Sequence, residues 1–172
     1  MHTGRYVIMG VAGAGKSEIG AAFAHALGVA FVEGDTYHSA MNIERMAAGV
    51  PLTDDDRQDW LMAIAARLRE SQRAGVGVVI SCSALKRRYR DLLREGAPDV
   101  RFIYLSGART LLGARLAQRR GHFMPPSMLD SQLAILEAPT DDEAAWEYDI
   151  DAPPAAIVGR LLARATSSHG VA

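Results

Sequence analysis

Short apolar runs alternate along the chain with longer stretches in which apolar residues recur at helical spacing. The runs predict buried strands, which are Arg5–Met9, Ala30–Glu33, Val76–Cys82, Val100–Leu105 and Tyr148–Ile150. The stretches between them predict helices, which are Ser17–Leu27, Asn42–Ala48, a helix capped by Thr53, Ser83–Arg94, Thr110–Arg120, Met128–Leu136 and Ala155–Ala165. This alternation predicts an α/β domain with a mainly parallel sheet of about five strands and helices on both of its faces.

The predicted helix ends carry the residues that usually begin and end helices. Gly28 follows the first helix as a C-terminal glycine would. Thr53 precedes the acidic run Asp54–Asp56, where the helix dipole favours negative charge. The chain has no internal repeat, low-complexity tract or linker, so we expect one domain over residues 1–172, with a disordered tail at 166–172.

The composition is that of an ordinary globular protein. The 172 residues are 49% hydrophobic and 23% charged, which excludes a disordered or fibrous chain. A single cysteine, Cys82, excludes an internal disulfide and a cysteine-rich zinc site. No apolar run approaches the ~20 residues that span a bilayer. We therefore expect a cytoplasmic protein without membrane contact.

Charge is nearly balanced overall but segregated along the chain. The net charge of −1 gives no global field for nucleic acid, so we expect no nucleic-acid partner. The segment Lys86–Arg120 is nonetheless strongly basic, while Glu33–Asp59 and Asp130–Asp151 are acidic. Most of these arginines fit solvated helix faces, but a basic middle also indicates a local anion site. Only Lys16 and Lys86 are lysines among 19 cationic residues, and a compact ammonium suits a specific site.

One segment between the first strand and the first helix matches the phosphate-binding pattern G-x-x-x-x-G-K-[ST] in full. Its residues are Gly10, Val11, Ala12, Gly13, Ala14, Gly15, Lys16 and Ser17. The glycines allow backbone N–H groups to converge on phosphate oxygens, and the helix N-terminus adds its dipole. In this pattern the lysine reaches the β- and γ-phosphates of ATP, and the hydroxyl binds Mg²⁺.

Several classes of phosphate-loop protein are disfavoured by the residues beyond the loop. The chain has no Asn-Lys dipeptide for reading guanine, and the strand around Val78–Ile80 continues into Ser81 without the acid of a motor ATPase. An acid comes early instead, at Asp35 after the second strand. There it can orient an acceptor hydroxyl and hold Mg²⁺ through water, although a loop aspartate can also simply cap a turn. These features favour a small metabolic kinase.

A more specific pattern extends over the chain from about residue 5 to 160. Its blocks are Gly34–His38, Asn42–Ala47, Gly49–Arg57 with Trp60-Leu61, Cys82–Lys86, Tyr89–Arg94, Gly121–Met124, Ser131-Gln132 and Leu136–Pro139. Together they strongly resemble the bacterial gluconate kinase (gluconokinase) family. Arg45 and Arg120 stand where that family often has lysine, and both keep the positive charge.

The resemblance implies ATP-dependent phosphorylation of D-gluconate at its 6-hydroxyl, with ATP and Mg²⁺ required. It also implies a three-layer αβα fold of the phosphate-loop NTPase type, similar to shikimate and nucleoside-monophosphate kinases. A helical substrate-binding region and a mobile lid at about residues 115–128 belong to this expectation. A homodimer is compatible with the resemblance.

Candidate site residues come from the motifs and the resemblance together. Lys16, Asp35 and Arg119 are the catalytic candidates, and Ser17 and Asp35 the metal ligands. For ATP we expect the phosphate loop with Arg115 and Arg119, unless these two arginines lie only on a surface helix. The expected substrate-binding residues are Asp35, His38, Arg45, Arg57, Ser83, Lys86, Arg90, His122 and Gln132.

Two other functions remain open from the sequence. One is a kinase of the same fold that acts on another small acceptor, such as shikimate or a different sugar acid. The other is a nucleotide-binding regulatory module that hydrolyses ATP slowly. Acceptor-dependent turnover separates the module from both kinases.

Overall fold

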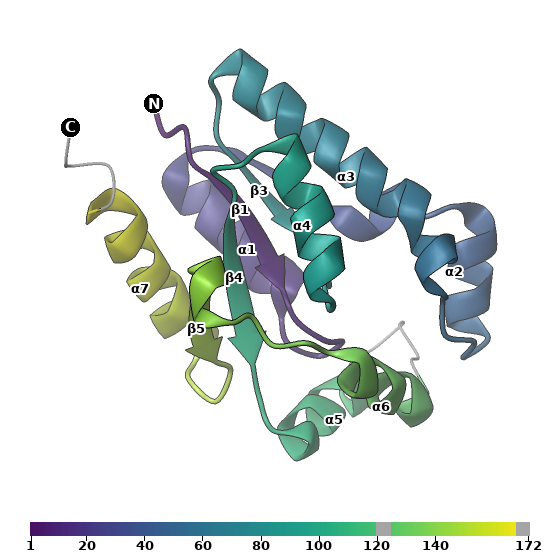
Figure 1. Ribbon diagram of the computed structural model, residues 1–172. Helices are drawn as coiled ribbons and strands as arrows, with labels where there is room; N and C mark the ends of the chain where they lie inside the picture. Colours follow the sequence, from purple (N-terminus) through teal and green to yellow (C-terminus); the bar gives the residue numbers. More distant parts are fainter. Residues whose placement is uncertain (120–124, 168–172) are drawn as a thin grey trace.

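The computed structural model describes residues 1–119 and 125–167 and contains a five-stranded sheet in the order β2-β3-β1-β4-β5 (Figure 1). Every strand pair is parallel. The strands are β1 (Arg5–Met9), β2 (Ala30–Glu33), β3 (Val78–Ser81), β4 (Arg101–Ser106) and β5 (Trp146–Asp149). The predicted α/β architecture and all five predicted strands are confirmed, with ends shifted by a few residues.

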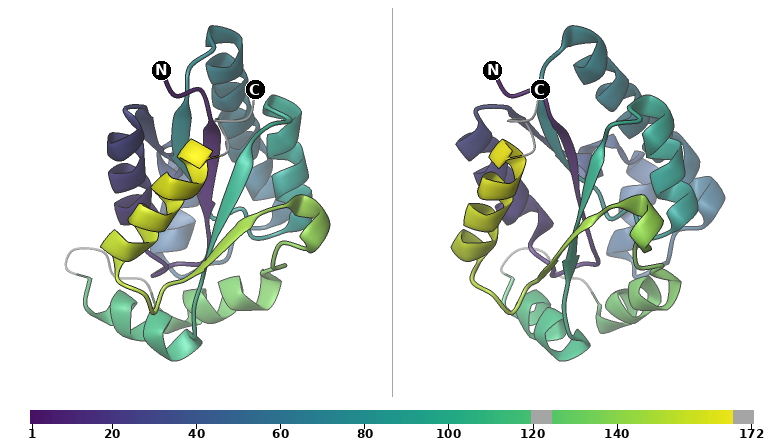
Figure 2. Two further views of the ribbon diagram at one scale, coloured as in Figure 1. Left: turned by 90° about the vertical axis from the view of Figure 1, so that its left-hand side faces the viewer. Right: turned by 60° about the vertical axis from the view of Figure 1, so that its left-hand side comes forward.

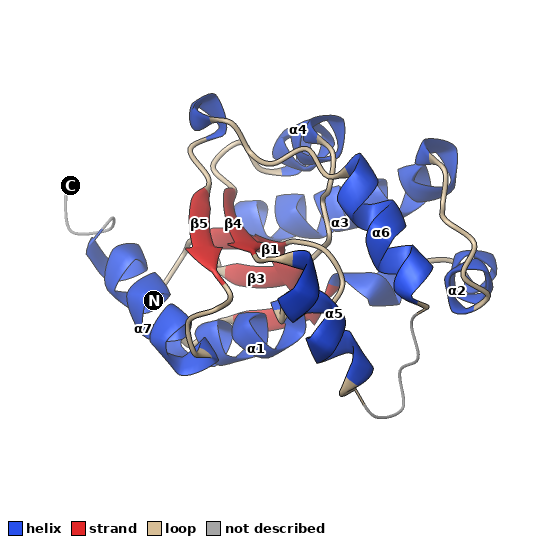
Figure 3. Cartoon of the chain, turned by 90° about the horizontal axis from the view of Figure 1, so that it is seen from below, coloured by secondary structure: helices blue, strands red, loops and turns tan. Residues whose placement is uncertain are grey.

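Helices cover both faces of the sheet and one of its edges. They are α1 (Lys16–Leu27), α2 (Ala40–Ala47), α3 (Asp54–Ala74), α4 (Arg87–Gly96), α5 (Arg109–Ala117), α6 (Pro126–Ile135) and α7 (Pro154–Ser167), with 3-10 turns η1 (Gly34–Tyr37) and η2 (Asp141–Glu143). Seen along the sheet, α1 and α7 lie on one face and α3 and α4 on the other (Figures 2 and 3). The expected three-layer fold is therefore confirmed.

Two hydrophobic cores lie between the sheet and the helices on its two faces, because successive side chains along each strand point to opposite faces. In β1, Tyr6 and Ile8 pack with α1 and α7, whereas Val7 and Met9 pack with α3 and α4. All four side chains are buried. A strand that is buried on both faces has a continuous run of apolar residues, and this run is why β1 could be predicted from the sequence.

The acidic run after Thr53 has a structural role at the start of α3. Thr53 Oγ1 accepts a hydrogen bond from the Asp56 amide, and Asp56 Oδ2 accepts one from the Thr53 amide, which forms a capping box. At the other end of α3, Gly75 adopts the left-handed conformation that glycine favours. Gly28 ends α1 in the same way, as predicted.

The C-terminal ends of the parallel strands meet at one edge of the sheet, next to α5 and α6 (Figure 1). Open α/β proteins bind their ligands at this edge. The loop after β1, the turn after β2 and the segment after β3 all leave the sheet there. Residues far apart in the sequence are thereby brought to one place.

Three sequence expectations differ from the structure. The helix expected from Ser83 begins only at Arg87, because Ala84 takes a left-handed conformation with φ of 45° that a helix cannot contain. The helix expected to reach Arg120 ends at Ala117, and α7 continues to Ser167, within the tail expected to be disordered. Residues 120–124 of the expected lid and 168–172 of the tail lie outside the described residues.

Within the described ranges, no helix is long and apolar enough to cross a membrane.

Candidate functional site

The phosphate-loop sequence forms the turn between β1 and α1. Gly10, Gly13 and Gly15 have φ values of 149°, 84° and 87°, a region that other residues rarely adopt. A Cβ atom on Gly10 would also lie 2.8 Å from the Leu105 carbonyl oxygen. Glycine is thus required here both for backbone conformation and for space, as a backbone cradle for phosphate needs.

Lys16 lies at the first turn of α1 and lines the cavity above the loop. Its Nζ donates to the Val11 carbonyl oxygen at 3.0 Å. Burial lowers the pKa of the Lys16 ammonium, while the Asp35 carboxylate opposes that shift. A partly desolvated cation beside carboxylates interacts strongly with any anion that enters the cavity.

Glu33, at the end of β2, is a site residue that the sequence analysis missed. Its carboxylate accepts hydrogen bonds from the Ser17 and Ser81 hydroxyls, which joins β2 and β3 to the phosphate-loop helix. Glu33 could have been identified from its place at the C-terminal end of a predicted parallel strand, directly before Gly34 and Asp35.

The oxygen atoms of Ser17, Glu33 and Asp35 line one cavity and suit a hard divalent cation. In the part of the chain that the structure describes, no group of three or more His, Cys, Asp or Glu side chains could hold a metal without help. Mg²⁺ is commonly held by one or two carboxylates with water and substrate phosphates, so the residues present fit this ion.

This cavity, which we call the transfer cavity, brings most of the predicted site together. It has a volume of about 120 Å³. The predicted residues that line it are Lys16, Ser17, Asp35, His38, Arg57, Ser83, Arg119 and Gln132. They come from segments that follow β1, β2, β3 and β4 in the sequence, and they meet at the C-terminal edge of the sheet.

His38 is buried at the wall of the transfer cavity, with 8% of its surface exposed. Its ring stacks on Trp60 with centroids 4.1 Å apart, and Trp60 Nε1 donates to the Gly34 carbonyl oxygen at 2.8 Å. Among the described residues, His38 Nδ1 has no hydrogen-bond partner. Burial lowers the pKa of His38, which favours a neutral ring at pH 7.

A second cavity of about 480 Å³, the acceptor cavity, adjoins the first and shares Leu52, Arg57, Met128 and Gln132 with it. Lys86 lines its wall, and Lys86 Nζ lies 3.1 Å from Asp54 Oδ1. Arg57 Nη1 donates to the Leu52 carbonyl oxygen at 2.7 Å. Two predicted cations therefore face a space that continues from the transfer cavity.

Gln132 of α6 connects the two cavities to the phosphate loop. Its Oε1 accepts a hydrogen bond from the Ala12 amide at 2.7 Å. Because an amide N–H needs an acceptor, this contact assigns the side-chain oxygen, and the Gln132 nitrogen remains a donor.

A third cavity, which we call the outer cavity, borders the phosphate loop and has a volume of about 340 Å³. Arg115, Arg119 and Pro154 line it together with Gly13 and Gly15. Arg115 Nη2 donates to the Ile150 carbonyl oxygen at 2.6 Å, which ties α5 to the segment before α7. Arg119 lines both the outer and the transfer cavity.

Two predicted substrate residues, Arg45 and Arg90, line none of these three cavities. Arg45 pairs with Asp56 at 2.9 Å. Arg90 is fully buried and bonds to Glu143. The predicted helix Ser83–Arg94 would place Lys86 and Arg90 four residues apart on one face, but this arrangement is wrong, because Lys86 precedes α4 in extended conformation. The remaining predicted residue, His122, lies outside the described residues.

Cys82, at the end of β3, does not act as a nucleophile. The thiol is buried, and burial raises its pKa to about 12. A buried thiol that stays protonated acts as a packing group.

Comparison with known proteins agrees with this geometry. A family model described as an AAA domain matches residues 6–139. The chain is 47% identical over 158 residues to the thermoresistant gluconokinase of Escherichia coli, covering 91% of this chain and 90% of that protein. It is 44% identical over 156 residues to the gluconokinase of Gluconobacter oxydans, covering 91% and 88%.

Solved structures give the same result. The crystal structure of a gluconokinase from Sinorhizobium meliloti is similar with a TM-score of 0.87 and 47% identity, covering 96% of this chain and 93% of that one. A shikimate kinase from Bacteroides thetaiotaomicron shares the fold at a TM-score of 0.67 with 20% identity, covering 94% and 97%. The phosphate loop, Asp35 after β2 and the two joined cavities agree with these similarities. The similarities show that the chain belongs to the gluconokinase family.

Proposed function

We propose that the protein transfers the γ-phosphoryl group of ATP to the 6-hydroxyl of D-gluconate, giving ADP and 6-phospho-D-gluconate. One observation carries this function. The transfer cavity holds Lys16 and Asp35 beside the phosphate loop, and it continues into an acceptor cavity that is lined by Lys86 and Arg57. A phosphate site joined to a cationic pocket suits an acceptor that carries a hydroxyl at one end and a carboxylate at the other.

ATP binds along the phosphate loop, with its β- and γ-phosphates over Lys16. The outer cavity between Arg115 and Pro154 receives the nucleoside part, since it borders the loop at Gly13 and Gly15 and shares no lining residue with the acceptor cavity. Ser17, Glu33 and Asp35 would hold Mg²⁺. When bound, Mg²⁺ neutralises charge on the phosphate oxygens.

Gluconate lies with its 6-hydroxyl at Asp35 and its carboxylate toward Lys86 and Arg57. The carbon chain follows the wall that both cavities share, formed by Leu52, Met128 and Gln132. His38 and the Gln132 nitrogen supply hydrogen bonds to hydroxyl groups of the chain. In the absence of gluconate, Asp54 neutralises Lys86; the carboxylate of gluconate then joins or replaces Asp54 as its partner.

Catalysis by these residues is positioning and charge stabilisation, without a covalent intermediate. Asp35 accepts a hydrogen bond from the acceptor hydroxyl and orients its oxygen toward the γ-phosphorus. Lys16 and Arg119 stabilise the charge on the transferred group. Water must be kept out, because it competes with the sugar hydroxyl for the phosphoryl group.

A coupled assay of ADP release tests this proposal. Mg-ATP is supplied with gluconate, with shikimate, with other sugar acids, and with no acceptor. Release that depends on gluconate supports the proposal. Release with another acid alone favours a different acceptor, and release that ignores every acceptor favours the regulatory ATPase.

A further inference from the structure

The segment Ser83–Lys86 connects β3 to α4 and carries two residues that face the cavities. Ser83 lines the transfer cavity and Lys86 lines the acceptor cavity. Between them, Ala84 is buried and has a φ of 45°. A left-handed conformation in a non-glycine residue persists only when the surroundings hold it. The placement of both cavity residues therefore depends on what holds this segment.

The carbonyl groups of the segment are held by specific donors. Ser83 O accepts from the Gly10 amide at 3.3 Å, and Leu85 O accepts from the Glu137 amide at 2.8 Å. The Ala84 carbonyl oxygen accepts from Arg90 Nη1 at 2.9 Å, and the same nitrogen lies 3.4 Å from Leu85 O. Arg90 thus supports the segment from the protein interior, without lining any of the three cavities.

Arg90 is itself fixed by Glu143. The Arg90 Nε and Nη2 atoms donate to the two Glu143 carboxylate oxygens, each at 2.7 Å. The side chains are 0% and 1% exposed. Glu143 also accepts from Arg94 Nη2 at 2.9 Å and from the Thr140 amide at 3.2 Å. One planar guanidinium therefore uses one edge for the carboxylate and its remaining nitrogen for the segment.

We propose that Arg90 is a positioning residue for the acceptor, acting through the backbone of Ser83–Lys86. It touches neither cavity; it sets where Ser83 and Lys86 lie. This inference rests on the proposed function, since it treats Lys86 as the residue that binds the gluconate carboxylate. It also explains why a buried arginine stands here, because only the guanidinium fork can bond a carboxylate and two carbonyl groups at once.

The experiment removes the support while limiting damage to the fold. Arg90→Met combined with Glu143→Gln takes away both charges, which avoids leaving one buried and unpaired. We expect kcat/KM for gluconate to fall about 10-fold to 100-fold, since small displacements of positioning groups have effects of this size. The loss should come mainly from a higher KM for gluconate, with the Kd of ATP, measured by calorimetry, unchanged.

Lys86→Gln tests the route of the effect. If Arg90 acts through the segment, the triple variant with Lys86→Gln loses much less kcat/KM, relative to the unmodified protein, than the product of the losses in the double variant and in Lys86→Gln alone. A full product would contradict the proposal. So would an unchanged KM for gluconate, or an equal weakening of ATP binding, which would indicate a general role in folding.

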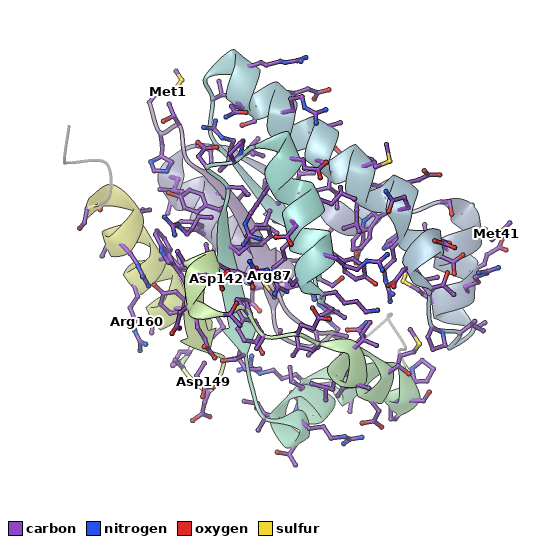
Figure 4. The ribbon with its side chains drawn as sticks, viewed as in Figure 1. Met1, Met41, Arg87, Asp142, Asp149 and Arg160 are labelled. Atoms are coloured by element: carbon purple, nitrogen blue, oxygen red, sulfur yellow. The ribbon has the colours of Figure 1, made fainter. Side chains whose placement is uncertain are left out.

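Arg87→Ala is the matched control. Arg87 lies on the same helix, and its Nη2 pairs with Asp142 of η2 at 2.6 Å on the molecular surface (Figure 4). Within the described part of the chain, its guanidinium bonds to Asp91, Thr140 and Asp142 rather than to the carbonyl groups of Ser83–Lys86. Its loss should therefore leave the KM for gluconate unchanged; a rise equal to that of the double variant would overturn the proposal.

Arg90→Lys provides a second variant that keeps the buried charge if the double variant does not fold. Lysine has a single nitrogen where the guanidinium uses three, so it cannot keep the Glu143 carboxylate on one side and the carbonyl groups on the other, and the KM for gluconate should again rise; a normal KM would overturn the inference. Failure of the proposed function is distinguishable from both results, because then the unmodified protein itself releases no ADP with gluconate.

Discussion

The phosphate-binding region and the proposed acceptor-binding region of this protein are built in different ways. The phosphate-binding region is one continuous segment, Gly10–Ser17, in which backbone N–H groups and a helix N-terminus provide the binding groups. The acceptor-binding region combines side chains from η1, the start of α3, the segment Ser83–Lys86 and α6. The first depends on local conformation, whereas the second depends on the packing of distant segments.

Ion pairs hold the second region together. Lys86 and Arg88 both pair with Asp54, and Arg90 pairs with Glu143. Removing one member of such an ion pair leaves its partner without a counter-charge, which disturbs the arrangement of the site. Changes in the first region should therefore affect ATP, whereas changes in the second should affect the acceptor alone.

Asp35→Asn should give the largest effect and separates catalysis from ATP binding. Loss of the carboxylate that orients the acceptor hydroxyl should lower kcat by about 10²-fold to 10⁴-fold. The Kd of ATP should change little, and calorimetry with steady-state kinetics measures both. Asp55→Asn is the control, because Asp55 is an exposed residue in the first turn of α3. Equal loss of ATP binding and turnover would remove the role assigned to Asp35.

Lys16→Met should have the next largest effect and tests the phosphate-binding region. Removing the ammonium that stabilises the transferred group should lower kcat/KM for ATP by about 10²-fold to 10³-fold. The KM for gluconate should change far less than the kinetics for ATP. Unchanged kinetics for ATP would contradict the phosphate-loop assignment.

The smallest predicted effect is that of acid, which should destabilise the proposed acceptor-binding region before the phosphate-binding region. Burial raises the pKa of Glu143, but hydrogen bonds from Arg90 and Arg94 outweigh it and hold the pKa at about 2, below the ordinary 4.5. Because the folded pKa is depressed, this stabilisation is complete above the unfolded pKa and is lost as pH falls toward the folded one. Amide exchange, corrected for intrinsic rates, should show α4 and η2 losing protection before α1.

Glu143→Gln is the control for this acid response, because an amide does not titrate in this range. In that variant the difference between α4 and α1 should grow by less as pH falls from about 5 to about 3, with the remainder due to Asp142, whose pKa Arg87 of α4 also lowers to about 2. Earlier loss of protection in α1 of the unmodified protein would contradict the comparison.

The difference between a contiguous segment and a site assembled from distant segments also explains how much could be predicted from the sequence. The phosphate loop was identified in full because its eight residues are contiguous, and its glycines take the backbone angles that the pattern requires. The strands were found because both faces of β1 and β3 are buried, which leaves an apolar run. Residue types within short contiguous segments were sufficient to predict the phosphate loop and the buried strands.

In the proposed acceptor-binding region, several residues that line the cavities were predicted, but their geometry was not. Arg90 was assigned to the substrate because a helix from Ser83 would place it beside Lys86. The left-handed Ala84 delays that helix and turns Arg90 toward Glu143, a residue 53 positions away. Glu33 was overlooked because its contacts with Ser17 and Ser81 exist only once β2 and β3 pair. Pairings between distant segments leave no periodic signal in the sequence.

The central claim is that the acceptor carboxylate binds at Lys86 while the distant hydroxyl receives the phosphoryl group. The most direct measurement compares kcat/KM for gluconate with that for its uncharged amide, gluconamide, in the unmodified protein and in Lys86→Gln. Arg88→Gln is the control, because Arg88 also pairs with Asp54 but does not line the acceptor cavity.

We predict that the unmodified protein and Arg88→Gln prefer gluconate by about tenfold to 100-fold, as expected for a hydrogen bond to a charged group. In Lys86→Gln this preference should fall several-fold, to the level that Arg57 alone sustains, with the Kd of ATP unchanged. An undiminished preference in Lys86→Gln would contradict the account.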